Sequence, residues 1–145
     1  MFSFTYPAIL KPEAATGGFV VNFPDIPEAL TEGDDLTDAL AQAADCLGAA
    51  LEGYLEGGRR IPIPSKPRRG QRLIQVPLYL APKLALYMAM SERRMNNVQL
   101  ARKLGVSETV VRRMLNPKHD TKAEKIQAAL EALGKRITVA VEDAA

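Results

Sequence analysis

The segment from Val98 to Asn116 constrains the fold of this chain more than any other stretch. In it a small residue, Ala101, is followed at fixed offsets by Gly105 and Ser107, and the apolar residues around them recur at three- and four-residue spacings. Gly105 can supply the positive φ that a sharp turn between two helices needs, and the Ser107 hydroxyl can cap the second helix. The segment therefore predicts a helix-turn-helix whose two helices cross closely at Ala101.

The polar face of the second helix in this segment predicts DNA binding. Arginine can pair bidentately with guanine in the major groove, and threonine can contact a base edge or a thymine methyl group. Residues at the helix ends and in the next connection are placed to contact phosphates. The predicted DNA-binding residues are Asn97, Ser107, Glu108, Thr109, Arg112, Arg113, Asn116, Lys118 and Lys122. Because single helix-turn-helix units bind weakly, we expect a homodimer or higher homo-oligomer that reads two half-sites of double-stranded operator DNA.

A different explanation of the same segment is an amphipathic helical hairpin whose basic residues form only a solvated face. A plain hairpin does not need alanine, glycine and serine at these offsets, so the pattern favours DNA binding.

The net charge of the chain has opposite signs on the two sides of a proline-rich segment. Residues 1–64 hold three basic and ten acidic residues, a net charge of −7, and since the whole chain carries +2 the remainder carries +9. Residues 61–70 contain three prolines, three basic residues and a glycine, which favours extended backbone over helix. We therefore expect two domains, residues 1–80 and residues 81–145, with different partners.

The hydrophobic periodicity predicts an α+β protein. In the first domain it predicts strands at 2–10, 18–23, 29–31 and 72–78, and one main helix that starts at a cap formed by Asp35 and ends before Gly57. Asp25 to Pro27 is expected to break the sheet. In the second domain it predicts helices at 82–93, 98–104, 108–115 and 122–133, followed by a C-terminal strand at 135–141 that could serve as a dimer contact.

The composition argues against several classes of function. No apolar stretch approaches the ~20 residues of a spanning helix, and the N-terminus lacks the features of a signal peptide, so we expect a cytoplasmic protein with no membrane association. With one cysteine, Cys46, and one histidine, His119, neither a zinc site of the usual ligands nor a cysteine–histidine catalytic pair is expected. We expect no metal and no cofactor.

Four motifs of the N-terminal half resemble the HicB antitoxin family: residues 6–9 (YPAI), 17–27 (GGFVVNFPDIP), 31–40 (TEGDDLTDAL) and 61–65 (IPIPS). The resemblance covers residues 4–65, and residues 101–136 resemble the DNA-binding half of those members that carry one. One departure is that Glu28-Ala29 stands where the family usually has Gly-Cys.

The resemblance implies a partial RNase H-like antiparallel sheet with one helix, followed by an all-α, lambda-repressor-like helix-turn-helix domain. It also implies an antitoxin that binds and neutralises a small basic HicA-type toxin, an mRNA-cleaving ribonuclease, and represses its own operon. The residues expected to contact the toxin are Phe23, Pro24, Asp25, Asp34 and Asp35. Independently, an acidic domain is suited to cover a basic RNA-binding surface.

Two other functions remain open at this point. In one, the chain is a stand-alone repressor whose acidic domain senses a small ligand. In the other, Asp25, Asp34, Asp35 and Asp38 form a carboxylate cluster for metal-dependent phosphodiester cleavage. We do not expect an enzyme, because Asp25 lies in a turn between prolines and the other three lie where a helix N-terminus favours negative charge.

Overall fold

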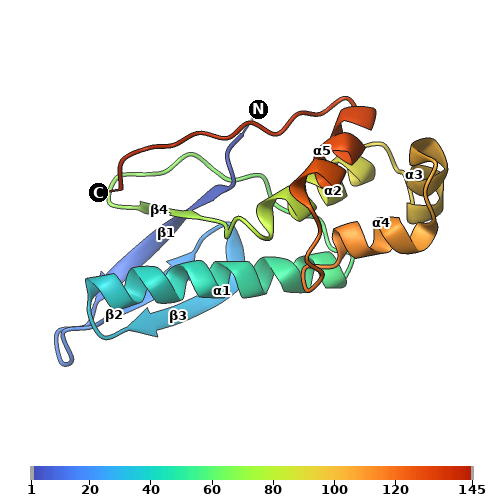
Figure 1. The fold of residues 1–145 in the computed structure, drawn as a ribbon. Helices are drawn as coiled ribbons and strands as arrows, with labels where there is room; N and C mark the ends of the chain where they lie inside the picture. Colours follow the sequence, from blue (N-terminus) through green and yellow to red (C-terminus); the bar gives the residue numbers. More distant parts are fainter. Residues whose placement is uncertain (1, 145) are drawn as a thin grey trace. The chain divides into compact units, whose positions relative to one another are not determined.

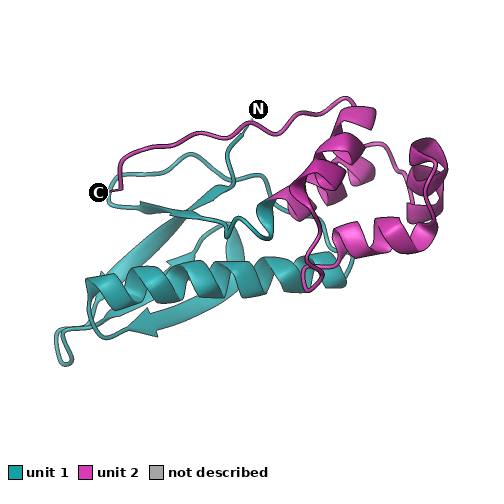
Figure 2. Ribbon diagram, in the orientation of Figure 1, with its two compact units in different colours: residues 1–81 teal, residues 82–145 magenta. Residues whose placement is uncertain are grey.

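The computed structural model describes residues 2–144, which divide into two compact units, one ending at Ala81 and the other beginning at Pro82 (Figure 2). The first unit combines a four-stranded antiparallel sheet with one long helix, and the second is helical (Figure 1). The predicted α+β class is therefore confirmed at this level.

The sheet of the first unit has the strand order β3-β2-β1-β4, and all neighbours are antiparallel. Its strands are β1 (Thr5–Pro12), β2 (Phe19–Phe23), β3 (Ile26–Gly33) and β4 (Arg72–Gln75). Alternate side chains of the strands point into the core, among them Tyr6 and Ala8 of β1 and Val21 and Phe23 of β2. The last strand comes from far along the chain, since Tyr6 pairs with Ile74.

Helix α1 (Leu36–Glu56) covers one face of this sheet and packs mainly against β3 (Figure 1). Its N-cap is Asp35, whose side chain accepts a hydrogen bond from the backbone N–H of Asp38 at 2.8 Å, as predicted. The Asp38 carboxylate accepts in turn from the N–H of Asp34 at 2.9 Å. The buried face of the helix includes Ala43, Leu47, Leu51, Tyr54 and Leu55.

The expected break of the sheet at Asp25 to Pro27 is wrong, because β3 begins at Ile26 and runs to Gly33. β3 lies at the edge of the sheet, where a proline without an N–H costs no ladder hydrogen bond. The β2–β3 pairing is irregular at Asn22 and Phe23, and this irregularity accommodates the tight turn at residues 24–25.

The proline-rich segment, residues 61–70, has no regular secondary structure and is tied to the sheet by side chains. Tyr6 donates its hydroxyl hydrogen to the carbonyl oxygen of Pro62 at 2.6 Å. The Asp25 carboxylate accepts from both the backbone N–H and the hydroxyl of Ser65, at 2.9 and 3.0 Å. With Ile61 buried at its start, the segment is an ordered strap and not a loose linker.

The second unit consists of α2 (Ala81–Glu92), α3 (Asn97–Leu104), α4 (Glu108–Leu115) and α5 (Ala123–Ala132), each within two residues of its predicted position. These helices share one apolar core. The core is formed by Leu86, Ala89, Met90, Leu100, Ala101, Val111, Met114, Ile126, Ala129, Leu130 and Leu133.

The predicted C-terminal strand at residues 135–141 is wrong. This segment pairs with no strand of the described chain, and the side chains of Val139 and Val141 are 88 % and 97 % exposed. Polar–apolar alternation favours a strand only where a sheet edge is available to satisfy the backbone.

Candidate functional site

The turn between α3 and α4 has the geometry that the sequence predicts. Gly105 ends α3 in the left-handed region, at φ 69° and ψ 32°, and the N–H of Val106 donates to the carbonyl oxygen of Ala101 at 3.0 Å. Ser107 then starts α4, and its side chain accepts from the N–H of Val110 at 3.3 Å. These two residues set the angle at which α4 leaves the turn.

Packing leaves one face of α4 free for a partner. Val111 and Met114 are buried against Leu100 and Ala101, whereas Arg112 and Arg113 are exposed. The side chain of Val106, which follows Gly105 in the turn, is 38 % exposed.

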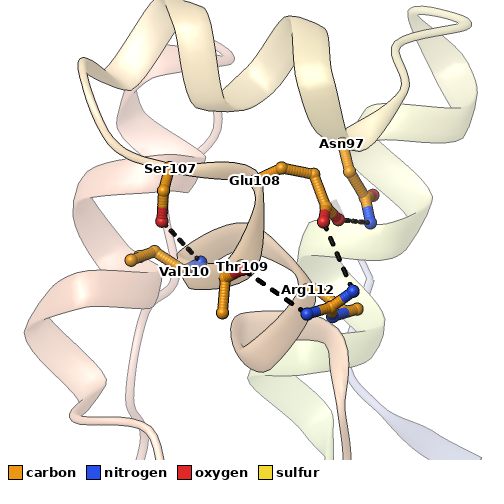
Figure 3. A network of polar contacts seen from close by, with 6 residues as sticks. All are labelled: Asn97, Ser107, Glu108, Thr109, Val110 and Arg112. Carbon is orange, nitrogen blue, oxygen red and sulfur yellow. Dashed lines mark hydrogen bonds and ion pairs between the residues drawn. The ribbon is translucent and has the colours of Figure 1, made fainter.

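A polar network joins the starts of α3 and α4 (Figure 3). The Glu108 carboxylate accepts from the side-chain amide of Asn97 at 3.2 Å and forms an ion pair with Arg112 at 3.5 Å. Arg112 also donates to the hydroxyl of Thr109 at 3.4 Å. The structure thus brings together four of the predicted DNA-binding residues, and Glu108 and Thr109 orient the Arg112 guanidinium.

Apart from Ser107, the N-cap of α4, the remaining predicted DNA-binding residues lie on or after α4. Arg113 is exposed, and its side chain forms no ion pair within residues 2–144. Asn116 is the C-cap of α4, and its side-chain oxygen accepts from the N–H of Lys118 at 3.0 Å. Lys118 and Lys122 are exposed in the connection to α5.

Lys83 is a residue that the sequence interpretation missed. Its side chain is 3 % exposed, and its ammonium donates to the carbonyl oxygens of Arg113 and Met114 at 3.2 and 3.3 Å. It also donates to the hydroxyl of Thr121 at 3.0 Å. Lys83 therefore caps the C-terminal end of α4, where carbonyls lack helical partners and the helix dipole favours a cation.

Two features of the surroundings of Lys83 shift its pKa in opposite directions. Burial lowers the pKa of Lys83, while the nearby carboxylate of Asp120 raises it. The Thr121 hydroxyl also donates to the Arg113 carbonyl at 3.2 Å and lies 2.9 Å from Nδ1 of His119. His119 is thus part of the connection after α4.

The five predicted toxin-binding residues do not form one patch. Phe23 is 1 % exposed, so its side chain belongs to the core and its prediction as a surface contact is wrong. Pro24 and Asp25 precede β3, and Asp34 and Asp35 follow it, at opposite ends of an eight-residue strand. Such a strand is roughly 27 Å long. Asp25 holds the strap and Asp35 caps α1. Pro24, Asp34 and Asp35 are exposed.

Glu28 and Ala29, which stand where the resemblance leads us to expect Gly-Cys, have separate structural roles. Ala29 is buried, and Glu28 accepts a hydrogen bond from the hydroxyl of Tyr54 and pairs with Arg59 at 3.3 Å. The Arg59 guanidinium also lies 3.9 Å from the centre of the Tyr54 ring. The Tyr54 hydrogen bond, followed by the Arg59 contact, holds the pKa of Glu28 below its ordinary value.

The described residues show neither a cluster suited to a metal ion nor a helix suited to a membrane. Within residues 2–144 no group of three or more histidine, cysteine, aspartate or glutamate side chains is arranged to hold a metal ion. No helix in the same range has the length and apolar character needed to span a bilayer.

Comparison with known proteins identifies the family. A family model described as a HicB-like antitoxin of bacterial toxin–antitoxin systems matches residues 5–85. Antitoxin HicB 1 of Photorhabdus laumondii is 37 % identical over 94 % of this chain and 86 % of its own length. Antitoxin HicB of Escherichia coli K12 is 38 % identical over 92 % of this chain and 96 % of its own length. Antitoxin HicB 2 of P. laumondii is 42 % identical over 88 % of this chain and 91 % of its own length. The chain belongs to the HicB-like antitoxin family.

Proposed function

We propose that this protein neutralises a HicA-type mRNA-cleaving toxin through its first unit and represses its own operon through its second. In this proposal it acts in the cytoplasm as a homodimer or higher homo-oligomer and has no catalytic role. One observation carries the proposal. The same chain joins an acidic unit, matched by an antitoxin family model, to a unit in which two capped helices, α3 and α4, are joined by a turn at Gly105.

The charge of the first unit supports a basic protein partner. Residues 25–56, which form β3 and α1, contain nine acidic residues and no basic residue. A surface of one sign raises the association rate with a partner of opposite sign and disfavours partners of like sign. A small basic ribonuclease fits this surface, and covering its RNA-binding face would block cleavage.

The geometry of the second unit supports DNA binding. Gly105 and Ser107 fix the turn, the core holds one side of α4, and the opposite side carries Thr109, Arg112 and Arg113. The exposed Lys118 and Lys122 lie beyond the end of the same helix, where they could contact phosphates.

The two activities can be tested separately, because each unit has its own core. Residues 1–81 should bind the cognate HicA-type toxin of this proposal and block its RNA cleavage in a purified assay. Residues 82–145 should bind the DNA upstream of the gene in a mobility-shift assay. If the first fragment left cleavage unchanged while the full chain blocked it, the assignment of neutralisation to this unit would be wrong.

The stand-alone ligand-sensing repressor has no support from the comparisons, since the relatives reported above are named antitoxins. The nuclease alternative is also weakened by the described aspartates. Asp25, Asp35 and Asp38 each accept structural hydrogen bonds from the backbone.

A further inference from the structure

Acidic and basic residues are separated within the first unit. After the acidic stretch of residues 25–56, residues 59–72 hold six basic residues and no acidic one. Arg59 is paired with Glu28. The other five, which we call the basic strip, are exposed and form no ion pair within the described range of the chain. They are Arg60, Lys66, Arg68, Arg69 and Arg72.

The backbone beneath the basic strip is held in place. The Asp25 carboxylate and the Tyr6 hydroxyl tie the strap to the sheet, as described above. At the far end, the N–H of Gln71 donates to the carbonyl oxygen of Arg68 at 3.0 Å, and the N–H of Arg68 donates to the side chain of Gln71 at 2.7 Å. Binding through these cations would therefore cost little backbone ordering, unlike binding through a disordered basic tail.

We propose that the basic strip binds the phosphate backbone of double-stranded DNA flanking the segment held by α4. This inference rests on the proposed DNA binding of the second unit. Arginine guanidinium groups bind phosphate oxygens bidentately, and contacts of this kind carry affinity without sequence preference. A basic toxin is a poor partner for this strip because like charges repel.

Chain connectivity supports DNA as the polyanion. Arg72 lies in β4 and is about ten residues from Pro82, where the second unit begins, so the two residues are at most about 36 Å apart. Once α4 is bound to DNA, this short covalent connection keeps the strip at high effective concentration near the same duplex. The first unit then adds to DNA affinity as well as binding toxin.

The test is a salt titration of DNA binding by the full chain. The double variant R68Q/R69Q is compared with K11Q/R136Q, which removes two exposed charges outside the strip. The probes are the duplex upstream of the gene and a random duplex. Each lost phosphate contact should make the slope of log K against log salt shallower by about 0.9. For R68Q/R69Q, which removes two such contacts, the slope should therefore become shallower by about 1.8, equally on both duplexes. K11Q/R136Q should keep the wild-type slope.

Each outcome of the salt titration either supports or overturns the basic strip as a DNA contact. An unchanged slope for R68Q/R69Q, or an equal change in K11Q/R136Q, would overturn the strip as a DNA contact, even if the wild type prefers the upstream duplex. Loss of toxin inhibition by R68Q/R69Q with an unchanged DNA slope would also overturn it and assign the strip to the protein partner. If the wild type showed no preference for the upstream duplex, the proposed repressor function would fail instead.

Discussion

The Nζ atom of Lys83 lies 3.0 Å from the Oγ1 atom of Thr121, and this contact joins the start of α2 to the connection that follows α4. The same ammonium reaches the carbonyl oxygens of Arg113 and Met114, so its three donors are all used. One side chain thereby fixes both the end of the proposed recognition helix and the loop that carries Lys118.

Replacing Lys83 with methionine should loosen the end of α4. The variant keeps the apolar stem but leaves the Met114 carbonyl without its donor, at a cost of about 1–3 kcal/mol in the free energy of unfolding. Chemical denaturation measures this loss, and amide hydrogen exchange should show faster opening around residues 113–116. Lys125→Met, at an exposed position of α5, should change stability by less than about 0.5 kcal/mol. Equal stabilities of the two variants would show that the Lys83 contacts contribute nothing.

Two glycine-to-alanine substitutions should have opposite effects on stability. Gly105 has a φ of +69° with open space around it, so Gly105→Ala should destabilise the protein by about 1–2 kcal/mol through backbone strain alone. Gly53 lies inside α1 with equally open space, so Gly53→Ala should stabilise it by about 0.5–1 kcal/mol. Thermal unfolding of the two variants checks the signs, and a stabilising Gly105→Ala would refute the role given to this turn.

Arg113 and Lys118 should differ in how they affect DNA specificity. If Arg113 reads a guanine, Arg113→Ala should cost about 1–3 kcal/mol on the operator and little on random DNA. Lys118→Ala should weaken binding to both duplexes about equally, because a phosphate contact carries no sequence information. Binding titrations on the two duplexes separate the cases. Equal losses for Arg113→Ala would reduce that residue to a backbone contact.

The contacts of Glu28 predict a dependence of stability on pH. Its pKa lies below the ordinary value of 4.5 in the folded protein, chiefly because Tyr54 donates to the carboxylate. The stabilisation is therefore fully present above pH 4.5, the unfolded pKa, and is lost as the pH falls through the lowered folded value. Glu28→Gln should lower the melting temperature at pH ~7, and its difference from the wild type should shrink in acid. The exposed Glu56→Gln serves as the control, and a difference that stays constant with pH would contradict the assignment.

The parts of the fold that local chemistry determines were predictable from the sequence. Asp35, Gly105 and Ser107 each act on the backbone within a few residues, and the helices they delimit lie within one or two residues of the predicted positions. α4 has the predicted bounds, since its cap and its apolar spacing agree.

The parts that depend on distant partners were not predictable. The tolerance of Pro27 in β3 follows from its position at a sheet edge, and the lack of a strand at residues 135–141 follows from the lack of a neighbour to pair with. The role of Lys83 depends on carbonyls thirty residues away in sequence. Its position among apolar residues at the start of a helix was the available signal, because a lysine there must find acceptors.

The pairing of β4 with β1 bears on the order in which the two proposed activities would become available during synthesis. Since Tyr6 pairs with Ile74, the sheet of the first unit closes once the chain through Gln75 has left the ribosome. The helices of the second unit follow later, because domains fold as units from the N-terminus during translation. In our proposal, a nascent chain can therefore capture toxin before it can occupy the operator, so that protection of the cell precedes silencing of the gene.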